Sequence, residues 1–422
     1  MNRKTFLRRS LAGASAFAIS PLAACASPAG IPSSTLDNLD VSDWSSIRNL
    51  FPLTRKRIYF NTGGLGPPSR IALNIMHEQV ELQAERGETY HSLFDQVRTS
   101  TAAFFGADPM EIAFNRNATE GNSTIAAGLD LRAGDEIIFE SHAHPGGSIP
   151  WMVQQKEKGV RVRIFEPDST LPENNLERIF SLVNDRTRVI QVSHLTAPTG
   201  ILFDVKAIAR EARQRGIWFH IDGAQSAGMI PFDLHEVGCD SYATSGHKWL
   251  NGPQESGILF IARERIDEVA CSHAGAYSDS GYKLPDTFSY NPAVQRHEYG
   301  TRDAGALLGL QAAMNLQEQI GRQRIAAHGK SLVDQCRKAL SKIPGLEILT
   351  PDHPAMYNSM ITFRLDGKVA GDVARALANE YQLRCREVTE RGLNAVRISW
   401  HVYNDTDNIP KLARAVRKIA AT

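Results

Sequence analysis

The middle of this chain alternates short apolar strands with an amphipathic helix, and this alternation restricts the fold more than any other feature. EIIFE at 136–140, RVIQVSH at 188–194 and IWFHID at 217–222 are apolar over most of their length, as buried strands are. The segment 205–215 has apolar residues at helical spacing. Strands buried on both faces belong to parallel sheets flanked by helices. Residues 100–265 are therefore predicted to form a doubly wound, mostly parallel α/β domain.

The rest of the chain divides around this domain. A helical stretch is expected from about residue 70 to 105, and a helix at 304–320 leads into a lobe with a mixed pattern. LEILT, SMITFRL, LRCRE and AVRISW are the predicted short strands of that C-terminal lobe. The expected parts are an export signal at residues 1–25, a tether with an N-terminal arm at 26–58, a large α/β domain at 59–305 and a small α+β domain at 306–422.

Composition and charge limit the class of protein. The 422 residues are 42% hydrophobic and 22% charged, which excludes a disordered or fibrous chain. Lys and Arg total 47 and Asp and Glu total 46, but four of the basic residues lie in the first 25 positions, where no acid occurs. A chain without that segment would have a slight acidic excess. No strongly basic face is implied, so nucleic acid is not expected as a partner.

The first 25 residues have the pattern of an export signal. NRKTFLR is a charged opening, and LAGASAFAISPLAA is an apolar segment too short for a permanent membrane helix. NRKTFLR resembles the twin-arginine export pattern, with Lys4 in place of the second arginine. LAAC resembles a lipoprotein signal-peptidase box, which predicts lipidation of Cys25, although cleavage nearby without lipidation is the alternative. The predicted location is the periplasm or cell envelope, with Cys25 as the candidate lipid anchor.

The remaining cysteines do not have the spacing of a metal site. They form no CxxC pair and are expected to be free thiols. His142 and His144 alternate as HAH, but no third ligand follows at a recognisable spacing, so no metal centre is predicted. The four cysteines are Cys239, Cys271, Cys336 and Cys385.

Polar residues lie just beyond the ends of the predicted strands. Asp222 ends IWFHID, Lys248 follows CDSYATSGH, His144 follows EIIFE, and Thr119 opens the helical segment NATEGNSTIAAGL. Each has an ordinary structural explanation by itself, as a cap or a surface loop residue. Ligands of open α/β sheets bind at the carboxyl ends of the strands. Taken together, the four residues therefore predict one site.

These residue types match the requirements of pyridoxal 5′-phosphate. Its phosphate binds backbone N–H groups at a helix N-terminus, its ring nitrogen needs a carboxylate that keeps it protonated, and its aldehyde needs a lysine amine. Asp222 and Lys248 supply the carboxylate and the amine, and His144 can stack on the ring. The predicted phosphate donors are the backbone N–H groups of Ala118, Thr119 and Glu120.

Three motifs occur together in the chain, namely HIDGAQSAG, SGHKWLNGP and VRISWHVYN. With them, the chain from about Tyr59 to its C-terminus resembles the class V aminotransferase family of fold type I pyridoxal-phosphate enzymes. The isopenicillin N epimerase-like branch is the most similar in appearance. The resemblance implies a fold type I transferase, with the doubly wound sheet in a large domain and a smaller α+β C-terminal domain.

The resemblance also implies roles at the cofactor. Gln225 would bond the phenolic oxygen, and Ser245 and His247 would bind the phosphate. The segment EYGTRD, which contains Gly300 and Thr301, resembles one that a second subunit lends to the phosphate. A homodimer with shared active sites is therefore implied.

On the substrate side, the resemblance assigns Arg397 to the α-carboxylate of an amino acid, and Asn61 and Gly63 to the substrate entrance. One departure is Ala197, since many relatives have an asparagine there that bonds the phenolic oxygen; Gln225 would then act alone. Another is the stretch EVTERGLNAV, which lacks the nucleophilic cysteine of desulfurases in this family. Desulfuration by persulfide transfer is therefore not expected.

The expected substrate is an amino acid or a peptidyl amino acid. Arg397 would orient its carboxylate, and Lys248 would take the α-proton as a general base. An aminotransferase-like reaction is expected, with epimerisation and β-elimination by a lyase as alternatives. A surface-tethered binding protein on a decayed enzyme scaffold is the rival from another class, and the intact set of Lys248, Asp222 and Arg397 argues against it.

Overall fold

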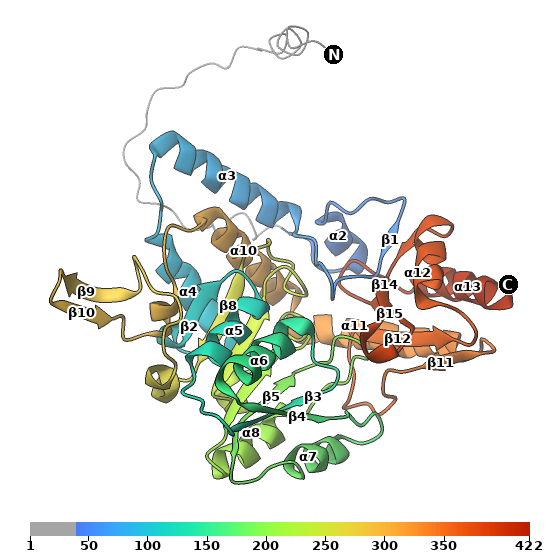
Figure 1. The fold of residues 1–422 in the computed structure, drawn as a ribbon. Coiled ribbons are helices and arrows are strands. Elements are labelled where there is room, and N and C mark those ends of the chain that lie inside the picture. Colours follow the sequence, from blue (N-terminus) through green and yellow to red (C-terminus); the bar gives the residue numbers. More distant parts are fainter. Residues whose placement is uncertain (1–38) are drawn as a thin grey trace, which may run out of the picture. The chain divides into compact units, whose positions relative to one another are not determined.

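The computed structural model describes residues 39–422, which lie within one compact unit. The predicted export signal and Cys25 lie outside the described residues. The central feature is a seven-stranded sheet with the order β2-β8-β7-β6-β5-β3-β4 (Figure 1). Its strands are β2 (Ile112–Asn115), β3 (Glu136–Glu140), β4 (Arg161–Phe165), β5 (Thr187–Ser193), β6 (Trp218–Asp222), β7 (Ser241–Ser245) and β8 (Gly257–Ile261).

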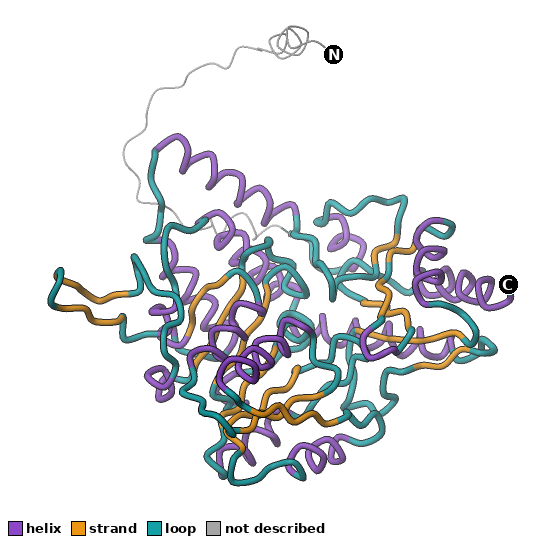
Figure 2. Tube along the Cα trace, in the orientation of Figure 1, coloured by secondary structure: helices purple, strands orange, loops and turns teal. Residues whose placement is uncertain are grey.

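Five neighbouring strands of this sheet, from β4 to β7, are parallel, whereas β8 runs antiparallel to both β7 and β2. Helices cover both faces (Figure 2). Alternate residues of β6 show why: Phe219 and Ile221 face one apolar core, and Trp218 faces another. The predicted doubly wound, mostly parallel α/β fold is confirmed. The helices that follow the strands are α5 (Ala118–Gly128), α6 (Pro145–Lys158), α7 (Pro172–Phe180), α8 (Val205–Gln214) and α9 (Leu234–Val237).

The predicted helical stretch at 70–105 is two helices, α3 (Arg70–Arg86) and α4 (Leu93–Phe105). The first ends at Gly87, whose φ of +66° is left-handed and whose N–H bonds the Gln83 carbonyl. Such a glycine satisfies a terminal carbonyl and turns the chain out of the helix. Apolar periodicity resumes only at α4. The break therefore comes from the left-handed turn at Gly87, which the apolar pattern of residues 70–105 does not reveal.

Both α3 and α4 pack against α10 (Ala304–Ile320), the predicted helix before the C-terminal lobe. That lobe contains a four-stranded antiparallel sheet in the order β11-β12-β15-β14. It has its own apolar core, which includes Phe363, Ile398 and Leu412. Its elements are α11 (Arg322–Leu340), β11 (Leu346–Ile348), β12 (Met360–Leu365), α12 (Ala370–Asn379), β14 (Arg386–Val388), β15 (Ala395–Ser399) and α13 (Asn408–Ala421). The domain boundary at residue 305 stays a prediction.

The segment LRCRE, predicted as one strand, is divided between two pairings. Its first part, β13 (Leu383–Arg384), pairs in parallel with β1 (Ile58–Tyr59), and its second part is β14. The N-terminal arm thus joins the C-terminal lobe, and its helix α2 (Trp44–Asn49) buries Ile47 in a cluster with Leu316 and Val402. The short 3-10 helices are η2 (Pro109–Glu111), η3 (Arg263–Glu268), η4 (Val294–His297) and η5 (Glu390–Gly392).

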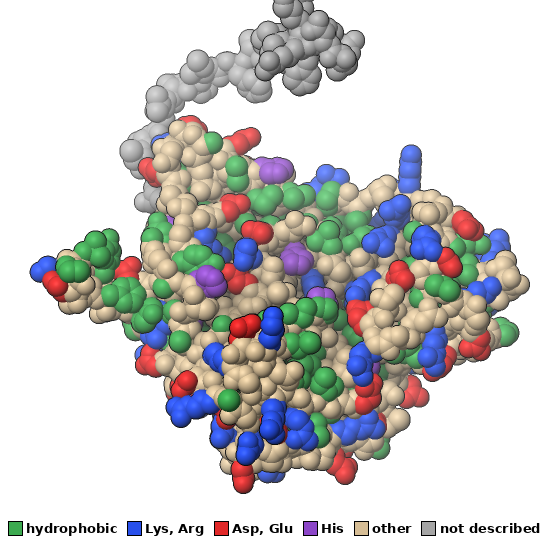
Figure 3. Space-filling model, in the orientation of Figure 1, with side chains coloured by type: hydrophobic (Ala, Val, Ile, Leu, Met, Phe, Trp, Pro, Cys, Tyr) green, Lys and Arg blue, Asp and Glu red, His purple; other side chains and the backbone are tan. Residues whose placement is uncertain are grey.

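A hairpin of β9 (Asp279–Lys283) and β10 (Thr287–Tyr290) projects from the α/β layer (Figure 1). Figure 3 shows hydrophobic side chains gathered on it, and Tyr282, Leu284 and Phe288 are more than half exposed. Within residues 39–422, no helix is both long enough and apolar enough to cross a membrane.

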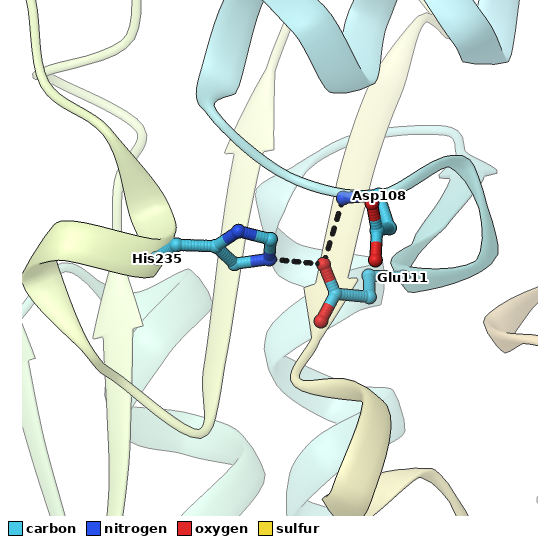
Figure 4. Close-up of side chains that lie close together, drawn as sticks. All are labelled: Asp108, Glu111 and His235. Atoms are coloured by element: carbon cyan, nitrogen blue, oxygen red, sulfur yellow. Dashed lines mark hydrogen bonds and ion pairs between the residues drawn. The ribbon is translucent and has the colours of Figure 1, made fainter.

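An ion pair ties α9 to the turn before β2. The Nε2 atom of His235 lies 2.6 Å from Oε2 of the buried Glu111, which also accepts the Asp108 N–H at 2.8 Å (Figure 4). The other carboxylate oxygen accepts the Arg263 N–H at 2.9 Å. The hydrogen bond to Glu111 raises the pKa of His235. Both Glu111 oxygens accept hydrogen bonds from the protein itself, so these contacts have a structural role in holding α9 against the turn before β2.

Candidate active site

A cavity of about 260 Å³ lies at the carboxyl ends of the central parallel strands, where ligands of such sheets bind. Most of the predicted site residues line it, although they are spread over the chain from residue 63 to 397. They are Gly63, Ala118, Thr119, His144, Asp222, Gln225, Ser245, His247, Lys248 and Arg397. The site therefore assembles as the strand-end argument predicts.

Lys248 follows β7, in a turn held by a hydrogen bond from the Asn251 N–H to its carbonyl. Burial lowers the pKa of its amine to about 8, although the Asp222 carboxylate opposes that shift. A substantial fraction of the amine is therefore neutral near pH 8, and a neutral amine can act as a nucleophile or a base.

Asp222 is the last residue of β6 and is buried. One oxygen, Oδ1, accepts the Ala224 N–H at 3.0 Å, and the other, Oδ2, accepts Nδ2 of Asn122 at 3.1 Å. These donors hold the carboxylate in a fixed orientation and stabilise its charge. Asn122 lines the same cavity and is a site residue that the sequence analysis missed.

The N-terminus of α5 reaches the cavity, but not all of its predicted phosphate donors are free. The Glu120 N–H bonds the capping side chain of Asn117 at 3.1 Å, and the Ala118 N–H bonds Ser245 Oγ at 2.9 Å. The Glu120 side chain turns away to Arg116. The helix cap thus uses the Glu120 N–H, whereas Ala118 lines the cavity together with Ser245. Phosphate binding by these backbone groups stays a prediction.

His144 caps the N-terminus of α6, where its Nδ1 accepts the Gly146 N–H at 3.0 Å. Burial, and secondarily the Lys248 cation, lower its pKa. A neutral imidazole at this position presents a flat ring to the cavity, and stacking on a cofactor ring stays a prediction. The neighbouring His142 instead contacts Thr199 at 3.0 Å, so the two histidines have separate surroundings.

Two glycines allow the backbone to approach the side chains of the site closely. A Cβ atom at Gly147 would lie 2.9 Å from Oδ2 of Asp222, and one at Gly63 would lie 2.9 Å from Nη2 of Arg397. Both contacts are too short for ordinary packing. Glycine at these two positions therefore lets the side chains of Asp222 and Arg397 lie close to the backbone.

Arg397 comes from β15 of the C-terminal sheet and is only 1% exposed. Its Nη1 donates to the Ala197 carbonyl at 2.7 Å, whereas Nε and Nη2 have no hydrogen-bond partner among the described residues. Burial, and then the nearby Arg386, lower its pKa to about 9. Two buried donors of one guanidinium, with no acceptor among residues 39–422, are arranged as a planar fork that fits a carboxylate.

Arg386 is a second arginine of the cavity, and it was not predicted as a site residue. It lies on β14 directly opposite Arg397 in the antiparallel register. Its Nη2 is paired with Glu390, while its buried Nη1 has no partner in the described chain. Like charges placed opposite each other are unfavourable, so the pair favours an anion between them. The cross-strand register, which places Arg386 opposite Arg397, is the signal that could have identified Arg386 as a site residue.

Gln225 and His247 complete the lining. The amide of Gln225 donates to the Gly63 carbonyl at 2.9 Å and accepts the Trp249 indole N–H at 2.8 Å. These bonds fix its position, while its predicted contact with a phenolic oxygen stays a prediction. Burial, and then Lys248, lower the pKa of His247 to about 4, and its Nδ1 is unpaired within the described structure.

Besides Glu120, three more predicted residues do not line this cavity. Asn61 lies beside it, with its side chain against Gly64. Thr301 lines a separate cavity of about 390 Å³ together with Glu120, and Gly300 immediately precedes it. Within one chain, Gly300 and Thr301 are therefore not part of the Lys248 site, and their role at a second subunit stays a prediction.

No described cysteine lines the Lys248 cavity. Cys239, Cys336 and Cys385 are buried free thiols, and Cys271 is partly buried. Burial raises the pKa of Cys385 to about 12. A thiol with so little thiolate at neutral pH is a poor nucleophile.

Comparison with known proteins agrees with this geometry. The family model described as aminotransferase class V matches residues 74–412. The chain is 30% identical to isopenicillin N epimerase from Streptomyces clavuligerus, covering 89% of this chain and 98% of that protein. It is 28% identical to a probable cysteine desulfurase from Methanothermobacter thermautotrophicus, over 89% of this chain and 97% of the other.

The fold is shared with solved structures. The apo structure of a cysteine desulfurase from Thermococcus onnurineus NA1 superposes with a TM-score of 0.81 at 24% identity, covering 89% of this chain and 98% of that one. The open guanidinium fork, the buried carboxylate, the lysine and the glycine-lined space fit pyridoxal 5′-phosphate with an amino acid. The chain belongs to the aminotransferase class V family, whose enzymes depend on pyridoxal 5′-phosphate.

Proposed function

We propose that this protein is an aminotransferase-like enzyme that acts at the α-carbon of an amino acid or a peptidyl amino acid. The observation that supports this most directly is the buried guanidinium of Arg397, which has two unpaired donors in the cavity of Lys248. A substrate carboxylate would satisfy these donors. The substrate amine would then lie toward the lysine end of the same cavity.

The chain's own residues divide the work. Arg397 and Arg386 bind and orient the carboxylate, and Lys248 takes the α-proton as a general base. Asp222 holds the proton on the ring nitrogen of the cofactor. Pyridoxal 5′-phosphate, when bound, supplies the electron sink that makes the α-proton acidic. Ser245, His247 and the N-terminus of α5 are the candidates to hold its phosphate.

The reaction branch depends on where the proton returns. Aminotransfer is the leading proposal, because Lys248 is the only amine that lines the cavity in the described chain, and one base can both remove and return the proton. Epimerisation is the second candidate, since the chain is 30% identical over nearly the full length of a protein named isopenicillin N epimerase. None of the four described cysteines lines the cavity, which argues against persulfide transfer.

One experiment separates these branches. The purified enzyme, loaded with pyridoxal 5′-phosphate, is incubated in D2O with a panel of L- and D-amino acids and peptides with free amino groups, with and without a 2-oxo acid. A new 2-oxo acid formed only with the acceptor indicates aminotransfer, deuterium at an inverted α-carbon indicates epimerisation, and release of a β-substituent indicates a lyase. Lys248→Ala is the control. A loaded enzyme that exchanges no α-proton with any substrate would contradict the proposal.

We also propose a homodimer in which Gly300 and Thr301 of one subunit serve the other subunit's site. Their separation from the Lys248 cavity within one chain supports this. Mixed Lys248→Ala and Thr301→Ala subunits should regain part of the activity, because one shared site in each heterodimer would contain neither substitution. No recovery after verified subunit exchange would count against shared sites.

Residues 1–25 are the basis of a proposal on location: export by a twin-arginine-type signal, with lipidation of Cys25. The segment fused to a folded fluorescent reporter should deliver it to the periplasm, and Cys25→Ser should remove lipid labelling without preventing export. A reporter retained in the cytoplasm would refute the first part, and unchanged labelling the second.

A further inference from the structure

A series of hydrogen-bonded, buried side chains runs through the sheet to the carboxylate of Asp222. β6 places Trp218, His220 and Asp222 on one face, because side chains two apart along a strand point the same way. Ser241 of β7 lies beside His220 in the parallel register, and Asn122 comes from α5. All five are buried.

Four hydrogen bonds connect these residues. Trp218 Nε1 lies 2.9 Å from Ser241 Oγ, and Ser241 Oγ lies 2.8 Å from His220 Nδ1. His220 Nε2 lies 2.9 Å from Asn122 Oδ1, and Asn122 Nδ2 lies 3.1 Å from Asp222 Oδ2. The chain therefore extends from an indole to the carboxylate without a gap.

The donor and acceptor groups at the two ends of this series determine which atom donates in each hydrogen bond. Asn122 Nδ2 also lies 3.1 Å from the Gly146 carbonyl, so this atom faces two acceptors and must be the amide nitrogen. Its oxygen therefore faces His220, whose Nε2 must carry the hydrogen. At the other end, the Trp218 indole can only donate, so Ser241 accepts from it and donates its own hydrogen to His220 Nδ1.

His220 is consequently a neutral relay in one tautomer. Burial lowers its pKa to about 4, so it carries no charge near neutral pH. Each of the four hydrogen bonds donates toward Asp222, and hydrogen bonds aligned in one direction polarise one another. The electropositive end of the chain thus meets the carboxylate.

We propose that Asn122 and His220 are positioning residues that act through Asp222: the aligned chain stabilises the negative charge of this carboxylate and so keeps the proton on the ring nitrogen of pyridoxal 5′-phosphate. In a buried pair, the proton can reside on the nitrogen, giving an ion pair, or on the carboxylate, giving a neutral pair. Donors directed at the carboxylate favour the ion pair. The proposal rests on the cofactor of the family and is independent of the reaction branch.

The test is ¹⁵N NMR of the enzyme loaded with cofactor labelled at the ring nitrogen, which reports the position of the proton without turnover. Wild type should give the resonance of a protonated pyridine. Asn122→Leu and His220→Leu put apolar side chains in place of polar ones and so break the hydrogen-bonded series, and should shift the resonance toward that of a neutral pyridine. His220→Gln, which can donate at one end and accept at the other, should restore most of the protonated signal.

Activity gives a second readout. Loss of one hydrogen bond that supports a charged group should lower kcat by roughly 10- to 100-fold in Asn122→Leu, with less effect in Ser241→Ala at the far end of the chain. Gln79→Leu, at another buried amide on α3, is the matched control and should leave both readouts unchanged. Circular dichroism and thermal unfolding identify variants that do not fold. If the leucine variants do not fold, Ser241→Ala, the mildest change, is used for the NMR measurement instead.

Two results would overturn the inference. The first is a neutral ring nitrogen in wild type. The second is an unchanged ¹⁵N resonance in folded, cofactor-loaded Asn122→Leu and His220→Leu, which would mean that these side chains only fill space. A shift in Asn122→Leu alone would remove His220 from the proposal. None of these outcomes depends on the substrate, so a failed search for substrates would not affect the test.

Discussion

At the scale of the residue, Arg397 illustrates how geometry restricts substitution. Lysine retains a positive charge but not the planar fork that binds a carboxylate through two parallel hydrogen bonds. Arg397→Lys should therefore lower kcat/KM by about 10- to 100-fold, mainly through KM, and leave the absorbance of the bound cofactor unchanged. Arg364→Lys, on the exposed side of β12, is the control. An unchanged KM would show that Arg397 does not bind the carboxylate.

Lys248 yields a prediction about pH. Its amine has a pKa lowered to about 8 by burial, so it is mostly charged below pH 8 and mostly neutral above it. Only the neutral amine attacks an aldehyde. The rate at which the cofactor-free protein captures pyridoxal 5′-phosphate should thus rise with pH and level off above about 8, as measured by stopped-flow absorbance. A rate that keeps rising toward pH 10 would indicate an ordinary lysine.

At the scale of the element, the link between α9 and the turn at Glu111 should make stability depend on pH. The raised pKa of His235 means that its contribution is complete below the ordinary value of 6.5 and is lost as pH rises through the higher value in the folded state. His235→Gln should therefore destabilise the protein at pH 6, by at most about 1 kcal/mol because the pair is partly screened, and hardly at all at pH 9.

The comparison is made by chemical denaturation of both proteins across this range. His77→Gln, at an exposed position of α3, is the control and should show no such trend. A stability difference that is constant from pH 6 to 9 would mean that the histidine contributes packing or a neutral hydrogen bond rather than charge.

The elements also show what sequence can predict. The strands β3, β5 and β6 lie within about one residue of the segments that the apolar pattern predicts, because buried strands are uniformly apolar and have clear ends. Their order places Asp222, His144 and Lys248 at one edge, which is why most of the site could be predicted. Two kinds of feature could not be predicted from the sequence. The first is the break between α3 and α4 at Gly87, which depends on the backbone conformation of one residue.

The other missed features depend on packing between segments distant in sequence. Arg386 becomes a neighbour of Arg397 only through the register of β14 and β15. Asn122 joins Asp222 only because α5 packs against the neighbouring strand β7, and the Glu120 N–H is engaged only because Asn117 caps the helix. Apolar periodicity carries no information about such contacts.

At the scale of the whole molecule, the cavity depends on the contacts between the seven-stranded α/β sheet and the four-stranded C-terminal sheet. Arg397 extends from the C-terminal sheet into the α/β cavity and is held by the carbonyl of Ala197. The segment that contains Ala197 is itself bonded to the C-terminal lobe: Thr362 Oγ1 of β12 donates to the Pro198 carbonyl at 2.8 Å, and Thr350 Oγ1, just after β11, donates to the Thr199 carbonyl at 2.7 Å. These threonines therefore position the carbonyl that orients the arginine.

Thr362→Val tests this dependence, because valine keeps the shape and removes the donor. The buried Pro198 carbonyl would lose its partner, at a cost of about 1–3 kcal/mol in unfolding free energy. The shift of its neighbour Ala197 should raise KM for the amino acid several-fold, while the cofactor, whose predicted contacts do not include the C-terminal sheet, should keep its absorbance and affinity. Thr99→Val, on the exposed side of α4, is the control. If stability falls but KM is unchanged, the join supports the fold without setting the position of Arg397; weaker cofactor binding would instead show that the two sheets form the cofactor site jointly.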